Sequence, residues 1–205
     1  MQSETLLLLE RRQSLRSTTR NKKMSTGYHI ANQESVYFVT FQVVEWIDIF
    51  SRKVYRDIIL ESLRYCQKNK GLEIFAFVIM TNHVHLLIRS SIGKLSDTIR
   101  EFKSFTARQI LDDIIDNPQE SRKKWMLNLF EFSAKKNKRS EQHQFWTHEN
   151  HAEEIVSNKF FEQKINYIHE NPVKAGFVAK AEDYLYSSAA AYAGEYCLLN
   201  VSIVK

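Results

Sequence analysis

The chain has 205 residues, of which 43% are hydrophobic, with two cysteines, five glycines and two prolines. This length and apolar content suffice for one domain with its own core, which excludes a wholly disordered chain. Two cysteines provide neither a disulfide framework nor a metal-knuckle spacing, and they fit a cytoplasmic protein. The formal net charge of +5 suggests a polyanionic partner and leaves its identity open.

The first 23 residues carry most of this charge. Six arginines and lysines against two glutamates give +4 here, so that only +1 of the total +5 belongs to the remaining chain. Residues 6–9 are four leucines, whereas a signal peptide needs about 7–15 apolar residues and a membrane span about 20. We therefore expect no membrane anchor. We interpret residues 1–23 as a basic N-terminal extension, dispensable or disordered, because Met24 begins a segment typical of an ordinary start.

The first half of the chain predicts three strands and a helix. Residues 36–43 are β-branched and aromatic, which indicates a buried strand. Apolar residues spaced by threes and fours predict a helix over residues 51–70, and Gly71 ends it. Residues 72–79 and 84–89 are two apolar runs with a short connection, so they predict an antiparallel hairpin.

The second half predicts two helices and a short strand. Residues 95–116 show a helical apolar stripe, with Ser96 as the expected N-cap. A charged, basic segment follows at residues 120–140. Residues 144–147 predict a short strand, and residues 153–170 a third helix that ends before a proline.

This order of elements lacks the regular alternation of a doubly wound parallel sheet. It predicts an α+β, ferredoxin-like fold with an antiparallel sheet and helices packed on one face, which leaves the other face for ligands. We place this domain at residues 24–180. Residues 181–205, rich in Tyr and Ala, are interpreted as a C-terminal arm.

Two histidines lie in the second strand of the predicted hairpin. Side chains alternate along a strand, so His83 and His85 share one face while Val84 points into the core. Two neutral imidazoles side by side are ready ligands for a divalent metal such as Zn, Mn, Ni or Co. A chance pair on a polar strand is the alternative. The apolar flanks count against it, because buried polar rings are costly.

Tyr167 and Asn171 lie four residues apart in the third predicted helix and share a face outside its apolar stripe. A phenol with a pKa of about 10 is a weak nucleophile at neutral pH, but a metal that polarises a phosphate makes its attack feasible. An amphipathic surface tyrosine is the alternative. We expect the neighbouring His169 to be exposed.

The basic segment contains aromatic residues between its cations, notably Trp125, Phe130 and Phe132. Cations that follow phosphates and rings that stack on bases are typical of a single-stranded nucleic-acid surface. A solvated charged face is the alternative interpretation. The residues expected to contact DNA are Arg122, Lys123, Lys124, Lys135, Lys136, Lys138, Arg139 and, after Tyr167, Lys174.

Two segments resemble the signature motifs of a known family. Residues 80–87, MTNHVHLL, and residues 166–176, NYIHENPVKAG, resemble those of the single-tyrosine HUH transposases, and more closely those of the REP-associated tyrosine transposases. The resemblance covers about residues 28–192. It implies an endonuclease and transposase that cleaves and rejoins single-stranded, hairpin-forming DNA. It also implies a divalent metal, Mg or Mn, and no nucleotide cofactor.

The same resemblance implies a role for each matching residue. His83 and His85 match the metal ligands, Tyr167 matches the nucleophile that forms a 5′-phosphotyrosine link, and Asn171 takes the place of a third ligand. We therefore expect a cytoplasmic, nucleoid-associated enzyme. The resemblance leaves open whether Tyr167 acts within its own chain or across a homodimer. Two alternatives stand beside it: a non-catalytic protein of this fold that binds single-stranded or hairpin DNA, and a metal-dependent nuclease in which water attacks.

Overall fold

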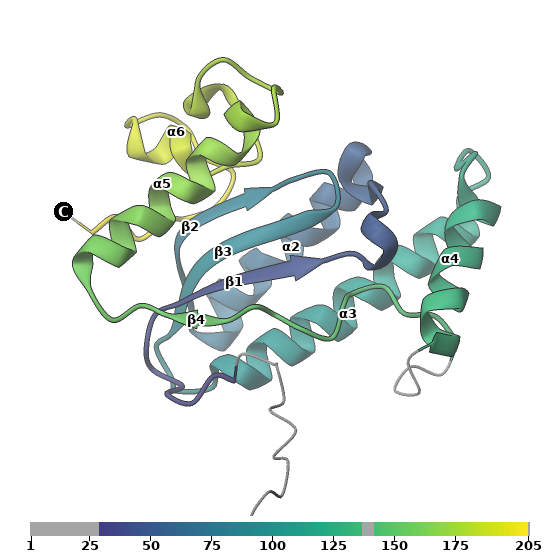
Figure 1. Cartoon of the computed structure of the whole chain (residues 1–205), viewed down its shortest axis with the longest axis horizontal. Helices are drawn as coiled ribbons and strands as arrows, with labels where there is room; N and C mark the ends of the chain where they lie inside the picture. Colours follow the sequence, from purple (N-terminus) through teal and green to yellow (C-terminus); the bar gives the residue numbers. More distant parts are fainter. Residues whose placement is uncertain (1–28, 137–141, 205) are drawn as a thin grey trace, which may run out of the picture.

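A four-stranded antiparallel sheet forms the centre of the protein in the computed structural model, which describes residues 29–136 and 142–204 (Figure 1). The strands follow the order β2-β3-β1-β4 and comprise β1 (Tyr37–Gln42), β2 (Leu72–Ile79), β3 (His83–Ser90) and β4 (Glu153–Glu154). The helices are α2 (Lys53–Lys70), α3 (Leu95–Asp116), α4 (Lys123–Lys136), α5 (Asn158–Lys174) and α6 (Ala189–Tyr192). Three short 3-10 helices complete the fold: η1 (Val44–Trp46), η2 (Ile49–Ser51) and η3 (Ala181–Asp183). The predicted α+β antiparallel fold is confirmed.

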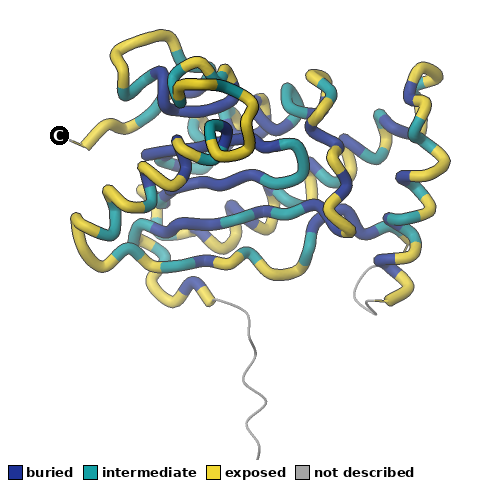
Figure 2. The backbone as a smooth tube through the Cα atoms, turned by 45° about the horizontal axis from the view of Figure 1, so that its top comes forward, coloured by how far each residue is buried: buried dark blue, intermediate teal, exposed yellow. Residues whose placement is uncertain are grey.

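The two faces of the sheet are covered differently. Helices α2 and α3 pack on one face, where Val39 and Leu86 belong to the main core (Figure 1). On the opposite face, α5 crosses β2 and β3, and its residues Ile165 and Ile168 pack in a second cluster with Phe38 (Figure 1). Figure 2 shows the strands buried between these layers, while the outer side of α5 is exposed. Helices α2 and α3 pack on one face, as expected. Helix α5 covers part of the other face, which was expected to be open for ligands.

The start of α3 differs in detail from the prediction. The helix spans the predicted residues 95–116, but its N-cap is Lys94 and no capping side chain bonds there. Ser96 lies inside the first turn, where its backbone N–H donates to Oε1 of Gln33 at 2.8 Å. The side chain of Gln33, distant in sequence, therefore takes the place of a local N-cap as the acceptor for a backbone N–H of the first turn.

The segment before α5 departs further from the prediction. The expected strand at residues 144–147 makes only an isolated bridge, Trp146 to Val43. The edge of the sheet is paired instead by β4, which was predicted as the first turn of the third helix. Helix α5 begins at Asn158 because the Ser157 side chain accepts from the backbone N–H of Phe160, and it continues through Pro172 to Lys174.

The residues after α5 fold back along the free edge of β2. Ser187 bridges Val78, the N–H of Ile79 donates to the Tyr186 carbonyl, and Oγ of Ser188 accepts from the N–H of Phe77 at 2.9 Å. The predicted C-terminal arm thus continues the hydrogen bonding of the sheet. The predicted N-terminal extension lies outside the described residues. In the described part of the chain, no helix combines the length and hydrophobicity needed to cross a membrane.

Candidate active site

The two histidines of β3 lie side by side on the sheet face that α5 partly covers. Their ring centroids are 4.6 Å apart, and Val84 between them is fully buried on the opposite side. His85 is itself buried, whereas His83, the first residue of the strand, is half-buried. The alternation of side chains along β3 therefore produces the pair of adjacent imidazoles that the sequence predicts.

Burial keeps both imidazoles neutral. It lowers the pKa of His83 to about 4 and that of His85 to about 3. The charge of Lys164, and that of His83 where it is protonated, lower the pKa of His85 further. A neutral imidazole has a lone pair with which to bind a metal, and protons no longer compete for it at neutral pH. The pair thus has the protonation state that metal binding requires.

Each imidazole has a hydrogen-bond partner at Nδ1. Nδ1 of His83 lies 2.7 Å from Oδ1 of Asn82, and Nδ1 of His85 lies 2.8 Å from Oγ1 of Thr40. When each Nδ1 donates its proton to that oxygen, the Nε2 lone pairs stay available for a metal. Sequence reasoning missed Thr40, because its position depends on the register that pairs it with His85.

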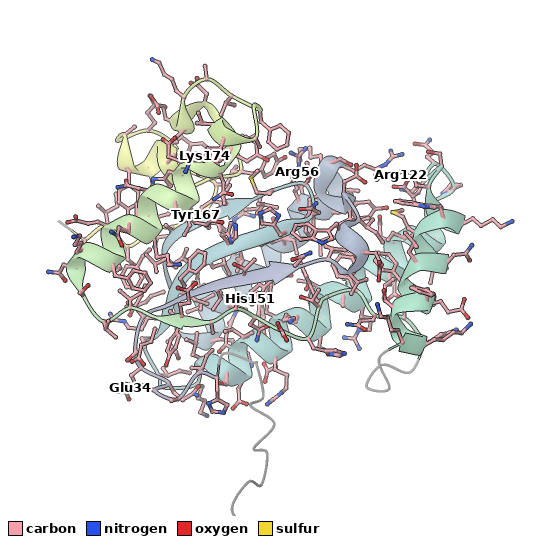
Figure 3. The ribbon with its side chains drawn as sticks, in the orientation of Figure 1. Glu34, Arg56, Arg122, His151, Tyr167 and Lys174 are labelled. Atoms are coloured by element: carbon pink, nitrogen blue, oxygen red, sulfur yellow. The ribbon has the colours of Figure 1, made fainter. Side chains whose placement is uncertain are left out.

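Tyr167 extends from α5 toward the histidine pair. Figure 3 shows its position over the sheet. Its ring centroid is 5.2 Å from that of His85 and 5.7 Å from that of Phe38. The side chain remains 43% exposed, so a substrate has access to the phenol. Ile165 and Ile168 are buried in the cluster that includes Phe38, and they thereby anchor α5 on this face of the sheet. The histidine pair and the tyrosine form one site within one chain.

Lys164 adds a positive charge to the site, one that sequence reasoning did not single out. Its Nζ lies 3.0 Å from Oε1 of Glu153 in β4, 4.0 Å from the centroid of the Phe38 ring and 5.9 Å from that of Tyr167. Its place three residues before Tyr167 is the signal that sequence analysis offered. The ion pair with Glu153 holds the ammonium over the face where the phenol lies.

Asn171 lies one turn after Tyr167, and its Nδ2 donates to the Tyr167 carbonyl oxygen at 2.6 Å. The amide nitrogen is thereby engaged, so Oδ1 is the atom with which Asn171 would ligate a metal. Among the described residues, no cluster of three or more His, Cys, Asp or Glu side chains is arranged to hold a metal ion. The imidazole pair is therefore the core of the candidate metal site.

The expectation that His169 is exposed is wrong. The side chain is buried, and its Nε2 lies 2.8 Å from Oγ of Ser188. The segment that folds back along β2 covers it, with the Tyr192 ring 5.0 Å away between centroids. Burial lowers the pKa of His169 to about 4.

The residues expected to contact DNA occupy different environments. Arg122 pairs with the buried Glu120 and with Asp48, far from Tyr167 (Figure 3). Lys123 donates to a backbone carbonyl, and Lys135 pairs with a glutamate on α4. The remaining positions are Lys124, Lys136 and Lys174, which are exposed, and Lys138 and Arg139, which lie outside the described residues. Of these cations, Lys174 is on the helix that carries Tyr167 (Figure 3).

Comparison with known proteins places these features in a wider context. The family described as "Transposase IS200 like" matches residues 10–142, a range that includes both histidines and ends before Tyr167. A solved REP-associated tyrosine transposase bound to a REP hairpin aligns with a TM-score of 0.58 and 16% identity, over 88% of this chain and 94% of that chain. A putative transposase from Deinococcus radiodurans R1 gives a TM-score of 0.39 and 19% identity, over 69% and 92%. None of the curated proteins matches the chain. The likeness to the first structure shows a shared fold.

Proposed function

Because the chain belongs to the IS200-like transposase family, we propose that it cleaves and rejoins single-stranded, hairpin-forming DNA through a covalent bond to Tyr167. The observation that carries this proposal is the contact of Tyr167 with His85, at 5.2 Å between ring centroids. A nucleophile and two metal-ligating side chains can then act on one phosphate. The solved structure of similar fold is described as bound to a REP hairpin, which supports hairpin DNA as the substrate class.

The histidine pair suits a divalent metal, Mg or Mn. His83 and His85 would hold it through Nε2, since Asn82 and Thr40 occupy the other ring nitrogens. Asn171 would add an amide oxygen, a ligand type that hard cations accept. When bound, the metal would draw negative charge from the non-bridging oxygens of the phosphate.

Tyr167 supplies the nucleophile. Its phenol oxygen loses its proton and forms a bond to phosphorus, while the bond from phosphorus to the 3′ oxygen breaks and that oxygen takes up a proton. One DNA strand then ends in a 3′-hydroxyl and the other in a 5′-phosphotyrosine. A 3′-hydroxyl that attacks this ester restores the DNA bond and frees the phenol. The ester conserves the bond energy, and strand joining therefore needs no nucleotide cofactor.

The contact between Tyr167 and His85 lies within one chain, which supports action of the tyrosine on a phosphate bound by its own subunit. A single copy then contains the nucleophile and both histidines. Under this proposal, a homodimer is unnecessary for cleavage.

The experiment is incubation with single-stranded DNA from the ends flanking the gene, with Mn or Mg, followed by a denaturing gel. The wild-type chain should form a covalent protein–DNA band. Tyr167→Phe should bind the DNA and form no band, while Tyr196→Phe, at a tyrosine 78% exposed in the C-terminal segment, should behave as wild type. Free cleavage products without a band would indicate that water attacks, and binding alone would indicate a non-catalytic protein.

A further inference from the structure

We propose that Trp46 is the platform on which one base of the DNA substrate stacks beside the scissile phosphate. This inference rests on the proposed function and names a substrate-positioning residue for it. The Trp46 side chain is 64% exposed, yet its ring centroid lies only 6.5 Å from that of His83. Other large apolar side chains are exposed as well, such as Trp125 and Tyr196. Trp46 differs from these two in its ring contact with a histidine of the candidate site.

The backbone at this point is held in an unfavourable conformation. Glu45 has a φ of 51° and Trp46 a φ of 54°, both in the left-handed region. This region is disfavoured for residues with a Cβ, and neither residue is a glycine or asparagine. Strained backbone of this kind is often found at functional sites, where the surrounding structure maintains it.

The hydrogen bonds that maintain the turn also connect it to the histidine pair. The carboxamide of Asn82 spans both: Oδ1 lies 2.7 Å from Nδ1 of His83, and Nδ2 donates to the Trp46 carbonyl oxygen at 3.3 Å. On the other side, Oγ of Ser133 in α4 donates to Oε1 of Glu45 at 3.1 Å. One side chain therefore orients a candidate metal ligand and fixes the position of the Trp46 turn relative to it.

The flanking residues show that the turn presents its tip outward. Val44 and Ile47 are buried on either side of it, so the chain is anchored in the core before and after Trp46. An exposed indole held in this way suits a nucleic-acid base, because every base has a π-face that stacks on an aromatic ring. The ring lies beside His83, so a base stacked on it would be near a phosphate held at the histidine pair. Single-stranded DNA leaves such a base unpaired.

The test is a binding measurement that involves no cleavage. In a Tyr167→Phe background, Trp46→Gly removes the ring and relieves the left-handed strain, so the variant should fold at least as stably as its parent. We expect it to bind single-stranded DNA roughly 10-fold more weakly, as loss of one stacked base predicts. Trp46→Phe should keep most of the affinity. Tyr65→Ala removes an exposed aromatic from α2, on the other side of the sheet, and should bind as its parent does.

A second series identifies the base. Abasic nucleotides are placed one at a time around the cleavage point. At one position, loss of the base should weaken binding to the chain with Trp46 about as much as the substitution Trp46→Gly does. The same abasic DNA should bind the Trp46→Gly variant no more weakly than intact DNA does. Equal affinity of Trp46→Gly and its parent, or an abasic effect unchanged by the substitution at every position, would overturn the inference. If the wild-type chain forms no covalent adduct but this coupling holds, the proposed chemistry fails and the role of Trp46 in binding stands.

Discussion

The rings of Tyr167 and Phe38 both contact His85, so the tyrosine of α5 reaches a histidine of β3 across the open part of the sheet. Phe38 lies on β1 and stacks on the imidazole with 5.4 Å between centroids, while its edge contact with Tyr167 is at 5.7 Å. The three rings are therefore in mutual contact, and the apolar ring of Phe38 packs against both polar groups. This packing holds the phenol close to the histidine pair without a hydrogen bond between them, which leaves the phenol oxygen for a substrate.

The hydroxyl of Thr40 should control metal affinity through His85. Thr40→Val keeps the shape of the side chain but removes the oxygen 2.8 Å from Nδ1, so the ring loses the partner that fixes its orientation. We expect the affinity for Mn to fall by about 10- to 100-fold, as for other partners of metal-bound histidines. Titration calorimetry measures this. Thr40→Ser, which retains the hydroxyl, should bind as wild type, and unchanged affinity of Thr40→Val would show that the hydroxyl has no such role.

Metal affinity should depend weakly on pH in the mildly acidic range. The pKa values of about 4 for His83 and about 3 for His85 mean that both rings stay neutral as the pH falls through 6.5, the ordinary value. A solvated imidazole would be protonated there, with a loss of about 10-fold in affinity per ring at about one pH unit below its pKa. We expect the Kd for Mn to change by less than about 3-fold between about pH 7.5 and about pH 5.5. A steep loss would contradict the burial of the pair.

Arg122 should matter for stability more than for DNA binding. The sequence predicts a DNA contact, whereas the guanidinium pairs with the fully buried carboxylate of Glu120, which also contacts Arg52 and Tyr55. Arg122→Ala should lower the free energy of unfolding by about 1–3 kcal/mol, because it removes hydrogen bonds from a buried charge. Thermal unfolding with a DNA-binding assay separates the effects. Lys124→Ala, at an exposed cation of α4, is the control for stability and should leave the unfolding temperature unchanged. Weaker DNA binding at unchanged stability would place Arg122 on the DNA surface instead.

His169 should make the stability depend on pH. Its folded pKa of about 4 lies below the ordinary 6.5, so the unfolded chain binds a proton first as the pH falls. The contribution of neutral His169 is fully present above pH 6.5 and is lost as the pH falls toward 4, by at most about 3 kcal/mol. The glutamine of His169→Gln does not titrate. In denaturant unfolding, the difference in the free energy of unfolding between wild type and this variant should therefore become smaller as the pH falls from about 6.5 to about 4. A difference that is constant with pH would refute the assignment.

Features set by local periodicity were predictable from the sequence. The alternation in β3 placed His83 and His85 together, and the apolar stripe of α3 gave that helix its observed bounds. The shared face of Tyr167 and Asn171 also follows from helical spacing alone. Each of these depends on residues that are neighbours in the chain.

Features set by contacts distant in sequence were not predictable. The position of Thr40 depends on the pairing register of β1 with β3, and the burial of His169 depends on a later segment that folds over α5. Glu153 and Glu154 carry no strand signal, because they pair with the sheet edge through their backbone. Arg122 pairs with Glu120, whose burial depends on contacts with Arg52 and Tyr55 from a distant part of the chain.

The most direct test of the account is to locate the covalent bond. The chain is incubated with single-stranded DNA from its own flanks and Mn, digested with protease and nuclease, and analysed by mass spectrometry. The account predicts one modified peptide, which contains Tyr167 and carries a nucleotide attached through its 5′-phosphate. A nucleotide on another residue, or cleaved DNA with every Tyr167 peptide unmodified, would contradict it.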